Sequence, residues 1–255
     1  MSEFHERRIE ELTSAEIHGA ISAGARTAIL PLGATEQHGP HLPLCVDSAH
    51  ADALAVRIAE RLGDALILPT IRVGYSPHHL GFPGTMTVSA STLEALCLDY
   101  CSSLETHGFE RVVLFSAHVG NYPVMRDFAP RLAATLGPRL QIIVYTDSAA
   151  ILRAWREAAQ AIAGLGEHVG GHADIAETSV MLELHPSVVR RDRAAAGYRG
   201  EVNDQFLRRC FEEGIHTVAP NGVLGDPEGM SKEIGRAALD AVTDLIVAYA
   251  RSREA

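Results

Sequence analysis

Two carboxylates and an imidazole lie close together near the N-terminal end of the chain, at Glu36, His38 and Asp47. Glu36 and His38 belong to a loop that follows an apolar run at 27–32. In extended backbone, positions i and i+2 project to the same side, so this loop can direct a carboxylate and an imidazole into one pocket. Asp47 stands at the predicted start of a helix and can reach the same pocket. The alternative is that it only caps this helix.

Two further stretches carry the same residue types. His118 directly follows another apolar run, and His172 and Glu177 lie in a glycine-rich stretch that leads into a helix. Imidazole and carboxylate ligands without thiolate suit zinc, manganese or iron, and a shared carboxylate holds two ions roughly 3.5 to 4 Å apart. The alternatives are a capping box formed by Asp174 and Glu177, and histidines that are only hydrogen-bonded. Together the residues predict a two-metal hydrolytic site.

Short apolar runs alternate with longer helical patterns in the first half of the chain, which is typical of a parallel sheet covered by helices. We expect strands at 27–32, 65–69, 111–115 and 140–145, and helices at 48–62, 91–107 and 122–136. This order predicts an α/β fold, a three-layer α/β/α sandwich with a mostly parallel central sheet. No linker or repeat interrupts residues 1–255, so we expect one domain.

The predicted sheet explains why the candidate residues meet. In a parallel sheet, the loops at the carboxyl ends of the strands form the crevice where ligands bind. The loops that carry His38 and His118 both follow predicted strands, so they converge on one edge. The pattern is weaker at 164–171, which is rich in glycine, and at 190–200, which is basic and irregular. Apolar residues return at helical spacing over 230–250 and predict a final amphipathic helix.

The charge balance excludes some classes of partner. The 32 acidic and 22 basic residues give a net charge of −10, and Lys232 is the only lysine, so we expect no nucleic-acid partner. Residues 1–8 are polar and mixed in charge, unlike a secretory signal. No apolar run approaches the roughly 20 residues of a membrane span. We therefore expect a cytoplasmic protein with no membrane partner.

The cysteines form no disulfide framework, because Cys45, Cys97, Cys101 and Cys210 include no CxxC pair. They are expected to remain reduced. Cys45 lies near the candidate loop and is either reactive or inert. Trp155 is expected in a helix, where it either packs in the core or lines a pocket.

Three motifs resemble the creatininase, or creatinine amidohydrolase, family, over about residues 29–184. The first is Glu-Gln-His-Gly-Pro-His-Leu-Pro at 36–43, which is followed by Asp47. The second is Gly-Phe-Pro-Gly-Thr at 81–85. The third is Gly-His-Ala at 171–173, which is followed by Glu-Thr-Ser at 177–179. The combination in this order is specific, and it implies an amidohydrolase with two divalent metal ions per subunit.

The resemblance implies a set of ligands for each ion: Glu36, Asp47 and His118 for the first, and His38, Asp47 and a further carboxylate for the second. In creatinine-hydrolysing members this last carboxylate is a Glu two residues after the histidine, but Gly120 stands there in this chain. The His-x-Gly-Asn pattern at 118–121 instead resembles a branch in which Glu177 supplies the ligand. Creatinine itself is therefore in doubt as the substrate.

The implied reaction is hydrolysis of a small cyclic or linear amide by a hydroxide that bridges the two ions. The departing nitrogen needs a proton, and the resemblance assigns this general acid to His172. Zinc is the first expectation for the metal, with manganese or iron as alternatives. Family members are commonly hexamers built from dimers, so the resemblance also implies a homo-oligomer.

Several alternatives remain open for the substrate. Other family members hydrolyse formamides of pyrimidine precursors, trim a peptide or open cyclic ketones, so a formamide deformylase and a short-peptide peptidase are alternatives. A phosphorylated substrate would need a basic pocket, for which Arg72, Arg190, Arg191 and Arg193 are available. A protein from a different class, which binds a metal or small ligand without catalysis, is a further alternative.

The irregular segment at 75–85 is of the kind that shapes a pocket. We expect His78 and His79 to touch the substrate, with a neighbouring subunit or solvent as the alternatives. Asn121 is also expected at the site. It binds the substrate there, orients the loop that carries His118, or caps the following helix.

Overall fold

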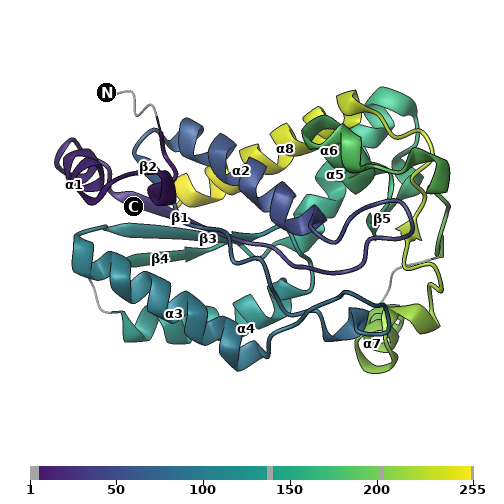
Figure 1. Ribbon diagram of the computed structural model, residues 1–255, viewed down its shortest axis with the longest axis horizontal. Coiled ribbons are helices and arrows are strands. Elements are labelled where there is room, and N and C mark those ends of the chain that lie inside the picture. Colours follow the sequence, from purple (N-terminus) through teal and green to yellow (C-terminus); the bar gives the residue numbers. More distant parts are fainter. Residues whose placement is uncertain (1–5, 137–139, 201–203, 254–255) are drawn as a thin grey trace.

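A four-stranded parallel sheet forms the centre of the protein (Figure 1). The computed structural model describes residues 6–136, 140–200 and 204–253. The strand order is β2-β1-β3-β4, with β1 at Thr27–Leu32, β2 at Ala65–Ile67, β3 at Arg111–Ser116 and β4 at Gln141–Val144. All four strands lie where the sequence predicts them, and β2 and β4 are each two residues shorter than expected.

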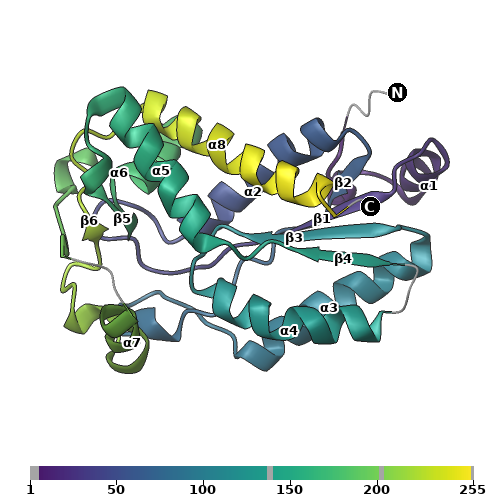
Figure 2. The same ribbon diagram turned by 180° about the vertical axis from the view of Figure 1, so that it is seen from behind.

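Helices cover both faces of the sheet (Figures 1 and 2). One face carries α2 (Val46–Leu62), α5 (Ser148–Ala163) and α8 (Lys232–Arg251), with α6 (Ile175–Leu184) packed beside α8. The other face carries α3 (Ala90–His107) and α4 (Asn121–Thr135). The predicted three-layer α/β/α sandwich is therefore confirmed.

The pairing of β1 with β3 positions the candidate residues. The two strands are in register from Thr27 opposite Arg111 to Leu32 opposite Ser116, so they end at the same edge of the sheet. All six residues of β1 are buried, as expected for a strand that is covered on both faces. The loops that contain Glu36 and His118 therefore start side by side.

Most of the predicted helix bounds agree with the structure to within one residue, and the starts of α2 and α8 each differ by two residues. Helix α2 begins at Val46 and not at the predicted residue 48, and its N-cap residue Cys45 makes no side-chain capping bond. Asp47 therefore lies within the first turn, and the alternative that it caps this helix is wrong. Helix α8 begins after Ser231, whose hydroxyl accepts a hydrogen bond from the Ile234 amide.

The second half contains elements that the sequence did not predict. A two-stranded antiparallel sheet pairs β5 (Val169–His172) with β6 (Leu224–Gly225). The glycines permit this close pairing, because a Cβ atom on Gly170 would lie 2.5 Å from the Leu224 carbonyl oxygen. Helix α7 (Asp204–Glu213) lies beyond the carboxyl ends of the sheet strands and packs against the 3-10 helix η2 (Figure 2).

The remaining elements are short or peripheral. Helix α1 spans Ser14–Ser22, and its N-cap residue Thr13 forms a capping box with Glu16. The 3-10 helices are η1 (Ile9–Glu11), η2 (Pro77–His79), η3 (Gly166–His168), η4 (Pro186–Val188), η5 (Arg191–Arg193) and η6 (Ile215–Thr217). Within the described ranges, no helix is both long and apolar enough to cross a bilayer.

Candidate active site

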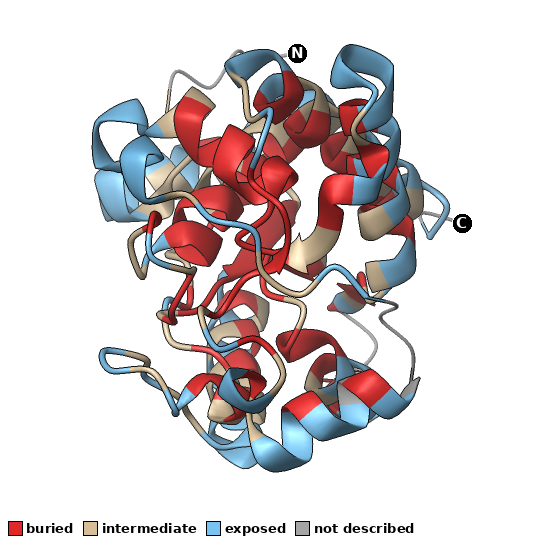
Figure 3. Cartoon of the chain, turned by 90° about the vertical axis from the view of Figure 1, so that its right-hand side faces the viewer, coloured by how far each residue is buried: buried red, intermediate tan, exposed pale blue. Residues whose placement is uncertain are grey.

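Asp47 lies between two histidines at the carboxyl edge of the sheet. Its Oδ1 is 3.2 Å from Nε2 of His38, and its Oδ2 is 3.4 Å from Nδ1 of His118. All three side chains are buried (Figure 3 shows this end of the molecule, coloured by burial). A carboxylate that presents one oxygen to each of two imidazoles has the arrangement of a bridging ligand.

Two further carboxylates extend this pattern on either side of Asp47. Oε1 of Glu36 is 3.2 Å from His118 Nδ1, and Oε2 of Glu177 is 3.6 Å from His38 Nε2. The geometry brings together several groups whose ligand atoms lie within 4.8 Å of one another: Glu36, Asp47 and His118; His38, His172 and Glu177; and Glu36, His79 and His172. The structure thus gathers all six residues for which the sequence predicts ligand or acid roles.

Backbone carbonyls orient the two histidines beside Asp47. His38 Nδ1 is 3.1 Å from the Glu36 carbonyl oxygen, and His118 Nε2 is 3.1 Å from the Tyr75 carbonyl oxygen. A carbonyl oxygen only accepts, so each of these ring nitrogens carries the proton. When the ring is neutral, as it must be to bind a metal ion, its opposite nitrogen is bare and faces the carboxylates. Metal-binding histidines are commonly oriented in this way.

The buried carboxylate oxygens lack hydrogen-bond donors. Both oxygens of Glu36 and Oδ2 of Asp47 are buried, and none accepts a hydrogen bond from the described residues. Burying a carboxylate without a partner is costly, and a bound cation offsets that cost. Orphaned carboxylate oxygens that face bare imidazole nitrogens fit divalent metal ions.

The pKa shifts of His38 and Glu177 also arise from the burial of several ionisable groups in this cluster. Burial opposes a charge on His38, but the carboxylates of Asp47 and Glu177 outweigh burial and raise the pKa of this imidazole to about 10. Burial raises the pKa of Glu177 to about 8, although the positive charge of His38 acts in the other direction. The cluster therefore attracts positive charge, which protons supply when no metal ion does.

Helix α6 places Glu177 in the cluster. Asp174 is the N-cap residue, and its Oδ1 accepts hydrogen bonds from the amides of Ala176 and Glu177. The predicted capping box is only half formed, because the Glu177 carboxylate accepts from the Ala173 amide and not from that of Asp174. Ala173 has a positive φ of 53°, and its amide donates to the Glu177 oxygen that lies 3.6 Å from His38 Nε2.

A cavity of about 260 Å³ opens beside the cluster. Its polar part includes Glu36, Asp47, His79, His118, His172 and Glu177, and its apolar part includes Leu152, Phe211, Ile215 and Leu224. No Lys or Arg is among the described residues that line it. The arginines that the sequence offered for a phosphate, at 72, 190, 191 and 193, lie elsewhere, and Arg72 pairs with Asp52.

The three residues predicted to bind substrate differ in position. His78 and His79 line the cavity, and the His78 ring lies 4.4 Å from the Phe211 ring between centroids. Asn121 does not line the cavity. Its amide accepts a hydrogen bond from the Tyr75 amide and donates to the Gly33 carbonyl, so it ties together the loops around His118.

The sequence reasoning assigned no role to Gln37, which contacts two of the site histidines, or to the apolar residues of the cavity such as Phe211. Gln37 is buried between His79 and His172, and its position inside the Glu-Gln-His motif was an available signal. Phe211 lies on α7, and nothing in its local sequence connects it with residues 36–47. The two residues with open roles lie outside the lining: Cys45 is exposed, and Trp155 is buried against His50.

Buried carboxylate and imidazole ligand atoms, beside a cavity at the carboxyl edge of a parallel sheet, define the class of α/β proteins with a candidate metal site. Within that class the chain belongs to the creatininase family, because the family model described as creatinine amidohydrolase matches residues 10–250.

Individual relatives within the family differ in their named activities. The chain is 33% identical to the mycofactocin precursor peptide peptidase of Mycobacterium ulcerans (strain Agy99) over 234 residues, which cover 88% of this chain and 84% of the relative. It is 32% identical to the creatinine amidohydrolase of Pseudomonas putida over 200 residues, or 72% and 74% of the two chains. A solved mutant creatininase of the Zn-Zn type has a TM-score of 0.78 and 27% identity, with 98% of each chain covered.

Proposed function

We propose that this protein is a dinuclear metal-dependent amidohydrolase that cleaves a carbon–nitrogen bond other than a peptide bond, in a small cyclic or linear amide. The position of Asp47 between the bare ring nitrogens of His38 and His118 carries this proposal. The ligand sets are Glu36, Asp47 and His118 for one ion, and His38, Asp47 and Glu177 for the other.

Two divalent cations held by these ligands would polarise an amide carbonyl and lower the pKa of the attacking water. Zinc is the preferred metal, which the resemblance to a Zn-Zn creatininase supports, with manganese or iron as alternatives. The residues of this chain fix the cations through negative charge and exclude bulk water by burial.

His172 is the proposed proton carrier. Its Nε2 is 2.8 Å from the Gln37 carbonyl oxygen, so Nε2 carries the proton and Nδ1 is bare. Nδ1 faces the cluster, 3.8 Å from Glu36 Oε1 and 4.0 Å from Glu177 Oε2. From this position it can accept the proton of the attacking water and deliver it to the departing amide nitrogen.

Cleavage of a short peptide is the second candidate. The resemblance to a peptide peptidase favours it, and so does the apolar side of the cavity, where Phe211 is partly exposed. The lack of Lys and Arg among the described lining residues weighs against a phosphorylated formamide, because a phosphate would have no counter-ion. A purely metal- or ligand-binding protein would show no turnover.

Metal analysis combined with a substrate panel tests the proposal. The panel contains creatinine, formanilide and the peptide glycyl-phenylalanine amide, each with the zinc-loaded protein. Hydrolysis of an amide other than a peptide supports the proposal, and hydrolysis of the peptide alone supports the second candidate. Asp47→Ala should lose metal and turnover, whereas His172→Ala should keep the metal and lose turnover. Full activity of His172→Ala would disprove its role as proton carrier.

We further propose a cytoplasmic homo-oligomer, with a hexamer as the form that the family resemblance implies. Sedimentation of the purified protein at micromolar concentration checks the assembly. A monomer under these conditions would refute it.

A further inference from the structure

Three of the four imidazoles in the cluster turn towards it the ring nitrogen that is bare when the ring is neutral. The outward nitrogen of each lies against a backbone carbonyl oxygen, at 2.8 to 3.1 Å: His38 against Glu36, His118 against Tyr75 and His172 against Gln37. Since a carbonyl oxygen cannot donate, the outward nitrogen carries the proton in every case.

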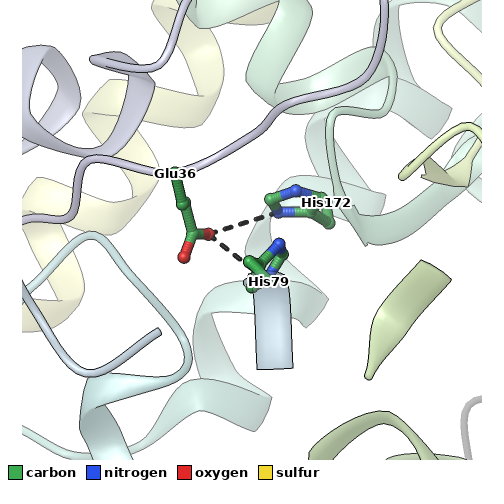
Figure 4. Close-up of side chains that lie close together, drawn as sticks. All are labelled: Glu36, His79 and His172. Carbon is green, nitrogen blue, oxygen red and sulfur yellow. Dashed lines mark ion pairs between the residues drawn. The ribbon is translucent and has the colours of Figure 1, made fainter. Parts of the chain in front are cut away.

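His79 has a different environment. Its outward nitrogen, Nδ1, is 2.9 Å from the side-chain nitrogen of Gln37. Its inward nitrogen, Nε2, is 3.5 Å from Glu36 Oε1 (Figure 4). The protonation of this ring therefore depends on which way the Gln37 amide points.

The surroundings of Gln37 fix its orientation. Its Oε1 accepts a hydrogen bond from the Gly39 amide at 2.9 Å, and its Nε2 is 3.1 Å from the Gly222 carbonyl oxygen. One amide proton goes to Gly222. The second goes to His79 Nδ1. It cannot go to the neighbouring His172 Nε2, because that nitrogen itself donates to the backbone carbonyl oxygen of Gln37. The two protons of the amide thus match two acceptors.

The backbone at Gly222 packs directly against this amide. A Cβ atom on Gly222 would lie 1.9 Å from Gln37 Oε1, and the residue has a positive φ of 77°. A side chain at this position would displace the amide, so the Gly222 loop holds Gln37 in one place.

We propose that Gln37 is a positioning residue that holds His79 as the tautomer with a proton on Nε2, so that His79 donates a hydrogen bond to the substrate's carbonyl oxygen as negative charge develops on it. His79 lines the cavity, as this role requires. A protonated Nε2 cannot ligate a cation, so the group Glu36, His79 and His172 is not a third metal site. The inference rests on the proposed amide hydrolysis for its catalytic part but not for its tautomer.

The decisive variant is Gln37→Glu, which keeps the size of the side chain. Carboxylate oxygens only accept, so His79 must then place its proton on Nδ1 and turn a bare nitrogen towards the cavity. Nitrogen-15 NMR of histidine-labelled, zinc-loaded protein reads the tautomer without any substrate. We expect the Nε2-protonated form of His79 in the wild type and the Nδ1-protonated form in the variant. A wild-type ring protonated at Nδ1 would overturn the proposal.

Kinetics test the catalytic part, on whichever of creatinine, formanilide or glycyl-phenylalanine amide is hydrolysed. Loss of a donor that acts in the transition state lowers kcat about 10²- to 10³-fold and leaves KM nearly unchanged. His79→Phe should show the same loss, and Gln37→Glu in the His79→Phe background should cost little more. Fully additive losses would show that Gln37 does not act through His79.

Two controls separate these outcomes from misfolding and from failure of the proposed function. Metal content and thermal midpoint are measured for each variant, and Gln37→Met serves if Gln37→Glu does not fold. Gln37→Met removes the donor, so His79 should become a mixture of tautomers, and a single Nε2-protonated form would contradict the proposal. If no amide of the panel is hydrolysed, the proposed function fails while the tautomer measurement still stands.

Discussion

The His118 ring occupies the space that a side chain at Gly120 would need. A Cβ atom on Gly120 would lie 2.3 Å from His118 Nε2. The same nitrogen is 3.1 Å from the Tyr75 carbonyl that orients the ring. The absence of a side chain at position 120 is therefore part of how His118 is aimed at Asp47.

Introducing a glutamate at this position should not create a second metal ligand. We expect Gly120→Glu to displace His118, lower the metal content and abolish turnover, and to show no hydrolysis of creatinine. Gly120→Ala should already destabilise the fold by about 1–3 kcal/mol, measured by urea unfolding. Gly19→Ala is the control, because Gly19 is exposed in α1 with nothing within 4 Å of its Cβ position, and it should be neutral or slightly stabilising. A metal-replete Gly120→Glu protein would contradict this account.

Removing the charge of Glu177 should affect one ion more than the other. Gln has the same size as Glu but is a weaker ligand, so Glu177→Gln should lower the metal content from about two ions to about one and reduce turnover at least about 10²-fold. Plasma emission analysis after dialysis measures this. Glu183→Gln, on the same helix but paired with Arg236, should change neither quantity. Retention of both ions by Glu177→Gln would exclude Glu177 as a ligand.

Phe211 should contribute to substrate binding more than to chemistry. The residue is 39% exposed, and its ring packs against the His78 ring at the side of the cavity. We expect Phe211→Ala to raise KM for formanilide about 10-fold and leave kcat within a factor of about two, because the contact is equal in the ground and transition states. Leu80→Ala is the matched control, since Leu80 is 55% exposed and lies outside the lining. An unchanged KM in Phe211→Ala would argue against contact with substrate.

His50 should make the metal-free protein sensitive to acid. Burial lowers the pKa of this imidazole to about 4, and neither ring nitrogen has a hydrogen-bond partner among the described residues. As the pH falls from 6.5 towards 4, the unfolded chain takes up a proton that the folded protein excludes, so stability is lost in this window and fully present above it. Between pH 7 and pH 5, the free energy of unfolding of His50→Leu should therefore fall by roughly 2 kcal/mol less than that of the wild type.

Urea unfolding of chelator-treated protein at the two pH values measures this difference. His18→Leu, at an exposed position on α1, should follow the wild type. Equal pH slopes for His50→Leu and the wild type would show that His50 is not the source of the acid sensitivity.

The first half of the fold could be predicted because buried parallel strands are continuous apolar runs. The buried strands β1 and β3 are recognisable by composition alone, and their in-register pairing places the loops of His38 and His118 at one edge. The type of chemistry followed from that placement. His172 and Glu177 were assigned to the same site by residue type and by the family resemblance, whereas their position depends on the pairing of β5 with β6 far along the chain.

The rest of the site depends on contacts that leave no local pattern. The glycine-rich β5 has neither apolar alternation nor helical spacing, since its glycines serve close backbone approach. The role of Gln37 follows from three hydrogen bonds to distant or neighbouring groups, and only the folded chain reveals them. Phe211 reaches the cavity because α7 packs against η2, which is a tertiary contact.

Helix α7 and the 3-10 helix η6 supply Cys210, Phe211 and Ile215 to the cavity but none of the candidate metal ligands. The ligands come instead from the loop after β1, the start of α2, the end of β3 and helix α6. On the proposed function, α7 and η6 would shape the substrate pocket without holding a metal ion. Changes confined to residues 204–217 should therefore alter substrate preference and leave the metal content unchanged, which offers both a route for divergence among relatives and a compact region for directed evolution.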